Sequence, residues 1–178
     1  YTYYVTEAPL VGYDTTETGM NIENALKTGD LTVHKQWSEP EGEAKNRPDD
    51  PIILTLYATV PDGQGGTRTL FERTATITTG SDTDWTYVFD GLPLYDSASG
   101  GVAQRIEYLL KESAIGGYEL VGADEQGHIQ VPVSTEAGWE VSLTNRMQQL
   151  NIVVEKEWIG DDAVAEETRI SPLVFTLE

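Results

Sequence analysis

The chain has 178 residues, of which 39% are hydrophobic and 9% aromatic, so it can form a globular core of modest size. Its 30 acidic and 11 basic residues give a net charge of −19, which argues against nucleic acid and anionic membrane surfaces as partners, because phosphate attraction supplies most of that affinity. The absence of cysteine excludes disulfides and thiolate chemistry. No apolar run reaches the roughly 18 residues that span a bilayer, so we expect no membrane insertion in this fragment.

The predicted elements are short strands in which apolar and polar residues alternate. In chain order they cover residues 31–37, 52–60, 68–78, 85–89, 105–112, 118–121 and 139–145, with an additional strand at 128–133. Turns at Asp90-Gly91 and Gly116-Gly117 separate them. Strands of this length and spacing predict an all-β protein with an immunoglobulin-like β-sandwich. The segment 40–51 is rich in charge and proline, so we expect a solvent-exposed loop there.

The sequence also repeats itself. Three pairs of segments share an offset of 121 residues (156 − 35, 177 − 56 and 145 − 24): 31–37 with 152–158, 53–56 with 174–177, and 20–24 with 141–145. Residues 1–7 match 106–112 at an offset of 105, and the shortfall of 16 (121 − 105) indicates an insertion at 123–137 in the central copy.

These matches predict tandem modules with truncated flanking repeats. Residues 1–28 are expected to be the C-terminal part of a preceding module, 29–148 a complete module, and 149–178 the N-terminal part of a following module. Tyr1 is an unusual first residue for a gene product, so we expect the sequence to be a piece of a longer protein.

Three polar residues continue the apolar faces of predicted strands: Lys35, Glu112 and Asn145. Side chains on one face of a strand are two residues apart. The apolar residues on the same face are Leu31 and Val33 for Lys35; Ile106, Tyr108 and Leu110 for Glu112; and Trp139, Val141 and Leu143 for Asn145. An isolated buried ammonium is very costly, so the three predict one buried polar site. The alternative is that each marks a strand end. Lys35 fits that alternative least, because Trp37 resumes the apolar face beyond it.

Several motifs follow one another in a characteristic order: Lys35-Gln-Trp37, Arg47-Pro48, Trp85-Thr-Tyr-Val-Phe89 with Gly91-Leu-Pro93, Tyr108 to Glu112, Gly117-Tyr118 and Leu143-Thr-Asn145. This order resembles the collagen-adhesin B-type (Cna-B) domain of Gram-positive surface proteins and pilins, over the whole central module. Such domains are stalk modules with an internal isopeptide bond. The resemblance implies Lys35 as the nucleophile, Asn145 as the acyl donor and Glu112 as the acid/base. The flanking-module counterparts are Glu7, Asn24 and Lys156.

Forming an amide from a lysine and a carboxamide requires a neutral amine and a proton donor. Burial is expected to lower the pKa of Lys35 and to raise that of Glu112. The reaction is a single-turnover self-modification, so we do not expect an enzyme, and it requires no cofactor.

Other kinds of site are less well supported. A hydrolase would need a second in-phase carboxylate beside Glu112. His34 is out of phase with the core and His128 lies in the insertion, so no metal site is expected from them. Paired aspartates such as Asp49-Asp50 and Asp161-Asp162 could bind calcium, but in loops they usually face solvent.

The main alternative function is an adhesin module that binds a host protein or glycan, for example through residues 123–137. That insertion is polar and has no aromatic platform, which favours a tolerated surface loop. The expected partners are neighbouring modules of the same protein, with a host extracellular-matrix protein or glycan bound by other domains. We expect an extracellular protein at the cell surface, anchored to the cell wall through regions outside this fragment.

Overall fold

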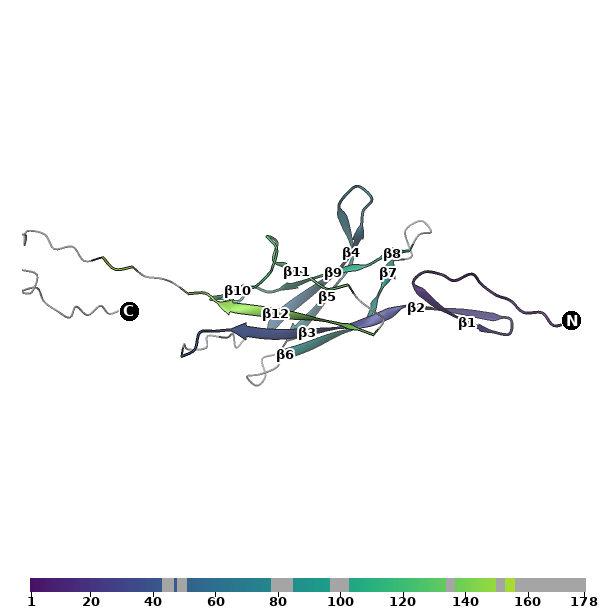
Figure 1. The fold of residues 1–178 in the computed structure, drawn as a ribbon, viewed down its shortest axis with the longest axis horizontal. Coiled ribbons are helices and arrows are strands. Elements are labelled where there is room, and N and C mark those ends of the chain that lie inside the picture. Colours follow the sequence, from purple (N-terminus) through teal and green to yellow (C-terminus); the bar gives the residue numbers. More distant parts are fainter. Residues whose placement is uncertain are drawn as a thin grey trace, which may run out of the picture. The chain divides into compact units, whose positions relative to one another are not determined.

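A computed structural model describes residues 1–42, 47, 51–77, 85–96, 103–133, 137–149 and 153–155. The chain divides into two compact units, Tyr1–Gln148 and Gln149–Glu178, and every described strand belongs to the first (Figure 1). None of the described residues is helical, so this part of the chain contains no helix able to cross a membrane.

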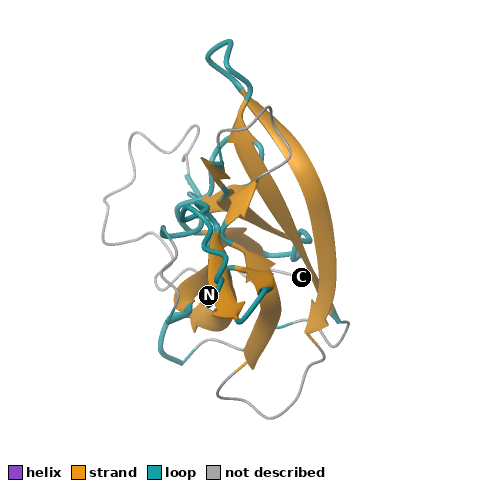
Figure 2. Ribbon diagram, turned by 90° about the vertical axis from the view of Figure 1, so that its right-hand side faces the viewer, coloured by secondary structure: helices purple, strands orange, loops and turns teal. Residues whose placement is uncertain are grey.

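Two four-stranded sheets form a sandwich in the first unit (Figure 2). One sheet has the order β10 (Tyr118–Leu120), β12 (Trp139–Met147), β3 (Thr28–Ser38), β6 (Trp85–Pro93). The other has the order β11 (His128–Gln130), β9 (Glu107–Glu112), β4 (Ile52–Pro61), β5 (Thr67–Ile77). Strands β3 and β12 run parallel, whereas the other neighbours in both sheets are antiparallel. The predicted all-β, immunoglobulin-like β-sandwich is confirmed.

Two small sheets complete the unit: β1 (Tyr13–Thr18) with β2 (Asn21–Leu26), and β7 (Tyr95–Asp96) with β8 (Gln104–Arg105). Strands β1, β2 and β7 were not predicted, and Arg105 of β8 was predicted as the start of the strand 105–112, which is instead interrupted at Ile106. Strands of two residues are too short for alternation to be visible, and the β1–β2 hairpin is mostly exposed, so it lacks an apolar phase. Strand β11 is shorter than expected, because Pro132 cannot donate a ladder hydrogen bond.

The expectation that residues 40–51 form a solvent-exposed loop is wrong at Arg47. Of the described residues in this segment, Glu41, Gly42 and Pro51 are exposed and Pro40 is half-buried, but the Arg47 side chain is only 16% exposed. Its guanidinium pairs with Glu39, and a paired cation can be partly buried at acceptable cost.

The β1–β2 hairpin reproduces the pairing of β10 with β12 at the two sequence offsets, 105 and 121. The corresponding pairs are Tyr13–Leu26 and Tyr118–Met147, Asp14–Ala25 and Glu119–Arg146, and Thr15–Asn24 and Leu120–Asn145. The backbone N–H of Lys27 donates to Gly12 O, and that of Gln148 to Gly117 O, both at 2.8 Å. The start of the chain therefore has the same local strand pairing as the end of the central module, while the division into tandem modules stays a prediction.

The core lies between the two large sheets and consists of the side chains that point inward, which are every second residue along most of each strand. Leu56 on β4 is fully buried, whereas Ile53 on the same strand is exposed. Burying a leucine side chain contributes about 1.5–3 kcal/mol, so these central positions hold the sheets together.

We expect Leu56→Ala to lower the free energy of unfolding of the full chain by about 2–5 kcal/mol, because it removes buried methyl groups and leaves a cavity. The matched control Ile53→Ala removes the same number of atoms from an exposed position and should cost no more than about 1 kcal/mol. Urea unfolding followed by circular dichroism measures both. Equal losses for the two variants would contradict the assignment of the core face.

Candidate functional site

Lys35, Glu112 and Asn145 come together between the two sheets. Lys35 lies on β3 and Asn145 on the parallel strand β12, while Glu112 ends β9 in the facing sheet. The register pairs Lys35 with Leu143 and Asn145 with Trp37, so the two cross-strand residues are diagonal neighbours on the inner face. The three residues are 4%, 8% and 2% exposed, respectively.

Glu112 contacts both of the other residues. Lys35 Nζ lies 3.5 Å from Glu112 Oε1, an ion-pair contact at the outer limit of hydrogen bonding. A side-chain hydrogen bond links Glu112 to Asn145. Lys35 Nζ also donates to Gln36 O at 3.2 Å and lies 4.0 Å from the centre of the Trp37 ring. The amine is thus held between a carboxyl group and an aromatic face.

Two oxygens of the cluster have unused hydrogen-bonding capacity. Glu112 Oε1 and Asn145 Oδ1 are buried, and neither accepts a hydrogen bond from any described residue. Leaving a buried acceptor unpaired costs roughly 1–3 kcal/mol. A proton on Glu112 would relieve this cost, because the resulting O–H could donate to the amide oxygen.

The pKa values of the pair move in opposite directions. Burial lowers the pKa of Lys35 to about 8 against the attraction of Glu112, and the neighbouring Arg47 cation contributes to this lowering. Burial likewise raises the pKa of Glu112, against the Lys35 charge and the Asn145 hydrogen bond. Both shifts favour the neutral forms. The site can therefore place a free amine and a protonated acid beside a carboxamide.

Aromatic rings and a cavity border the cluster. Trp37 packs edge to face against Trp85 and Tyr118, with ring centres 5.3 and 4.9 Å apart. A cavity of about 330 Å³ reaches Glu112 and Asn145 and is also lined by Ile115 and Tyr118, among others. The rings exclude water from the Lys35 side, while the cavity leaves a route to the carboxamide.

The flanking counterparts occupy a different environment. Asn24 Nδ2 donates to Glu7 Oε2 at 2.8 Å, and the Thr15 hydroxyl donates to Asn24 Oδ1 at 2.6 Å, all in exposed positions. Glu7 and Asn24 are therefore together, as Glu112 and Asn145 are, but in solvent. Lys156 lies outside the described residues.

The other residues considered from the sequence do not form a site. His34 lies 3.5 Å from Glu140, and His128, on the other sheet, packs against the Tyr57 ring and lies 3.4 Å from Asp124. No group of three His, Cys, Asp or Glu side chains able to hold a metal occurs in the described part of the chain. Asp49-Asp50 and Asp161-Asp162 lie outside it.

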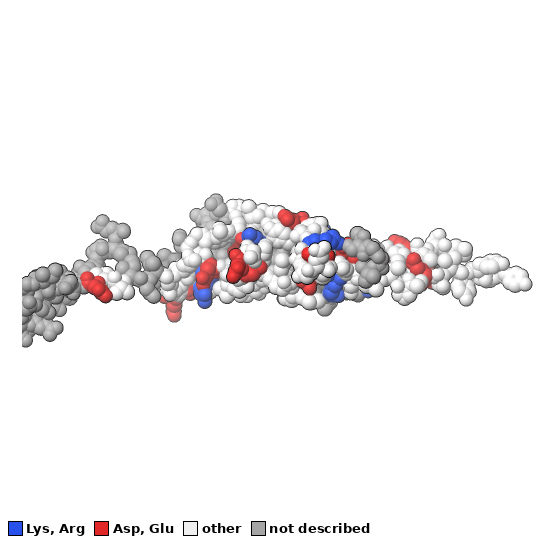
Figure 3. All heavy atoms as spheres, turned by 90° about the horizontal axis from the view of Figure 1, so that it is seen from above, with Lys and Arg blue, Asp and Glu red and all other residues white. Residues whose placement is uncertain are grey.

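The surface charges include both signs. Figure 3 shows acidic and basic side chains interspersed on one face. The exposed ion pairs of the described residues include Arg73–Asp90. Such exposed pairs contribute little to stability. In the insertion, Asp124 accepts hydrogen bonds from the backbone N–H groups of Gln126 and His128, so it stabilises its own turn.

Sequence reasoning missed Glu39 and Tyr118, together with the position of Arg47. The Tyr118 hydroxyl and the Arg47 guanidinium both donate to the Glu39 carboxylate, beside Trp37. No periodicity relates a residue at a strand end to one in a loop. The in-phase position of Trp37 next to Lys35 was the available signal that this end of the core is closed.

Comparison with known proteins places the chain in a family. The model of the family described as "Cna protein B-type domain" matches residues 31–145. A comparison with curated proteins finds no match. Similar solved structures include a B repeat unit of the collagen binding surface protein of Staphylococcus aureus, which is 20% identical, with 78% of this chain and 62% of that chain covered and a TM-score of 0.43.

Two pilins are also similar. The shaft pilin SpaA from Lactobacillus rhamnosus GG, in a double-mutant form, is 17% identical, with 68% of this chain and 52% of that chain covered and a TM-score of 0.41. The minor pilin GBS52 from Streptococcus agalactiae is 14% identical, with 82% and 58% covered and a TM-score of 0.38. The matched regions are less than two thirds of the length of these three structures. Because the family model matches more than half of the chain, from β3 to β12, the chain belongs to the Cna protein B-type domain family.

Proposed function

We propose that the chain is a structural stalk module of a Gram-positive cell-surface protein, closed by an amide bond between Lys35 and Asn145. The observation that carries this proposal is the buried position of Glu112, which contacts both residues from the opposite sheet. Membership of the family supports the stalk function. The protein would act outside the cell, next to further modules of its own chain and anchored through other regions.

The bond would form without any cofactor. The neutral Lys35 amine attacks Asn145 Cγ, while protonated Glu112 donates a hydrogen bond to Oδ1 and polarises the carbonyl. The new bond joins Nζ to Cγ, and the bond from Cγ to Nδ2 breaks. Glu112 relays the proton lost by the amine to Nδ2, so that one ammonia leaves. The cavity beside Glu112 and Asn145 offers an exit for it.

The product would remove the main electrostatic cost of the site. A neutral amide replaces a buried amine that would otherwise have to stay protonated without water or lose its proton. The bond would also close the chain from residue 35 to residue 145. For a cross-link that closes a loop of about 100 residues, the restriction of the unfolded chain contributes about 4–5 kcal/mol.

The position of the bond suits a load-bearing module. β3 and β12 are the first and last long strands of the sandwich and lie side by side in parallel. A force that enters at the start of β3 and leaves at the end of β12 would pass through the amide. The strands between them would then carry no load.

We expect the intact mass of the full chain to be one ammonia lower than its sequence requires. Lys35→Ala, Glu112→Ala and Asn145→Ala should each have the full sequence mass, because each removes a reacting or proton-carrying group. Lys111→Ala, which changes the neighbouring lysine on β9, is the matched control and should keep the loss. Mass spectrometry of the intact proteins and their peptides measures this. A full-mass wild-type chain would refute the proposal.

A second prediction concerns the reactive amine. In the folded chain without the bond, the pKa of Lys35 is about 8 and lies below the ordinary value of 10.5. Asn145→Ala, which cannot form the bond, keeps Lys35 as a free amine and so allows this shift to be measured. Between these pH values the unfolded chain binds more protons, so stability should rise with pH by up to about 1.4 kcal/mol per unit. The double variant Lys35→Met, Asn145→Ala should lack this rise of stability with pH. Urea titrations over a pH series give the free energy of unfolding of the single and the double variant. If the two curves of stability against pH run parallel, Lys35 is charged in the folded state.

A further inference from the structure

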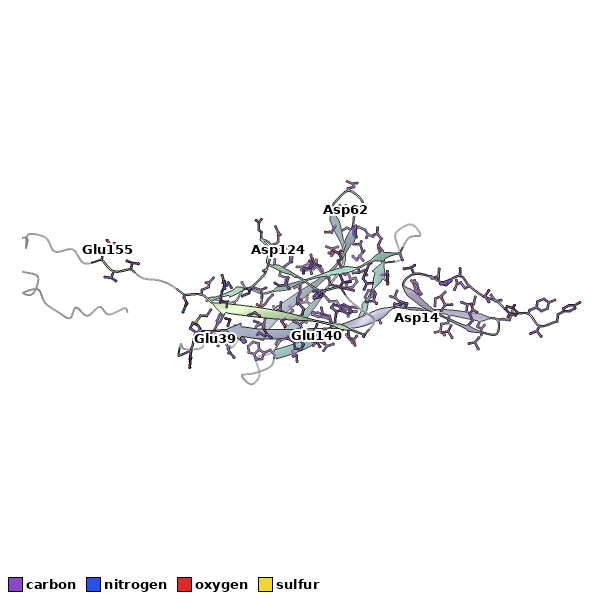
Figure 4. The ribbon with its side chains drawn as sticks, viewed as in Figure 1. Asp14, Glu39, Asp62, Asp124, Glu140 and Glu155 are labelled. Atoms are coloured by element: carbon purple, nitrogen blue, oxygen red, sulfur yellow. The ribbon has the colours of Figure 1, made fainter. Side chains whose placement is uncertain are left out.

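Arg47 and Glu39 form a partly buried ion pair at the end of the sandwich where the polar cluster lies. Arg47 Nε donates to Glu39 Oε1 at 2.9 Å and Nη2 donates to Oε2 at 2.7 Å. The side chains are 16% and 9% exposed. Figure 4 shows Glu39 just beyond β3. Such a two-pronged pair fixes the guanidinium plane as well as its position.

Tyr118 joins this pair to the aromatic wall. Its hydroxyl donates to Glu39 Oε1 at 2.7 Å, and its ring packs against Trp37. The Arg47 guanidinium lies 5.3 Å from the centre of the Trp37 ring, and Lys35 Nζ lies 4.0 Å from the same ring. The indole is therefore held by groups from β10 and from the loop after β3, and it contacts the amine.

We propose that Arg47, Glu39 and Tyr118 are positioning residues for the cross-link, because they hold the Trp37 indole as a fixed wall against the Lys35 amine. This inference rests on the proposed function. A fixed wall keeps the amine dry and directs it toward Glu112. Displacing a reacting group by about 1 Å can slow a reaction about a hundredfold, so the rigidity of the wall matters for the rate.

The charges around Lys35 give the arrangement a second effect. The charged groups that face the amine are Glu112 from β9 and Arg47 from the loop, and Glu39 partly neutralises Arg47. The Arg47 cation disfavours a second positive charge nearby and so lowers the pKa of Lys35. Removing Arg47 should therefore shift the pH dependence of bond formation, which a purely structural role would not do.

In the test, the full chain is recovered unfolded in urea and is then refolded at a series of pH values. Bond formation is followed as the loss of one ammonia from the intact mass. Arg47→Ala should form the bond about tenfold or more slowly than wild type, with its pH midpoint moved upward. Arg47→Lys keeps the charge but loses the two-pronged pair, so its midpoint should stay and its rate should be intermediate. Tyr118→Phe keeps the ring and should slow the reaction without moving the midpoint.

Arg68→Ala is the matched control. Arg68 pairs with the buried Asp96 at 2.8 Å, and Arg68 lies opposite Val60 on β4, whereas Glu112 lies opposite Leu54. This variant loses a comparable ion pair away from the cluster and should form the bond like wild type.

The outcomes separate the two proposals. If wild type forms the bond and Arg47→Ala forms it at the same rate with the same midpoint, the positioning role is overturned and the stalk module stands. If wild type forms no bond, the proposed function itself fails. Should Arg47→Ala not fold by circular dichroism, Arg47→Lys and Tyr118→Phe decide, and wild-type rates in both would overturn the inference.

Discussion

The burial of Lys35 between two sheets is the constraint on which the rest of the structure depends. An ammonium group without water must find an opposite charge or lose its proton. Glu112 supplies the first solution only partly, at 3.5 Å, and burial drives both groups toward their neutral forms. The cluster is therefore a poor ion pair, and the neutral forms that burial favours are the ones that the proposed reaction requires.

The sheet topology determines which residues meet this amine. β3 and β12 are parallel neighbours, so the chain must cross the whole sandwich before its last strand returns beside its first. Asn145 reaches the inner face next to Lys35 only because of that return. A bond at this point would tie together two strands that are distant in sequence and adjacent in space.

The N-terminal hairpin shows that residue identity alone does not make such a site. Glu7 and Asn24 are hydrogen-bonded, and the β1–β2 hairpin that contains Asn24 has the same register as β10 and β12 of the central module. They are nevertheless exposed, because no facing sheet covers them among the described residues. The difference between the two pairs is desolvation, and desolvation is what moves the pKa values in the central cluster.

The sequence alone predicted the sandwich, most of its strands and the inward phase of Lys35, Glu112 and Asn145, because strand alternation reports which face a side chain occupies. The sequence offsets of 105 and 121 also relate the register of the β1–β2 hairpin to that of β10 and β12. It could not predict the contacts among Glu39, Arg47 and Tyr118, nor the exposure of the Glu7–Asn24 pair. Alternation says which face is buried but not what lies opposite it. Only the packing of one sheet and its loops on the other decided those contacts.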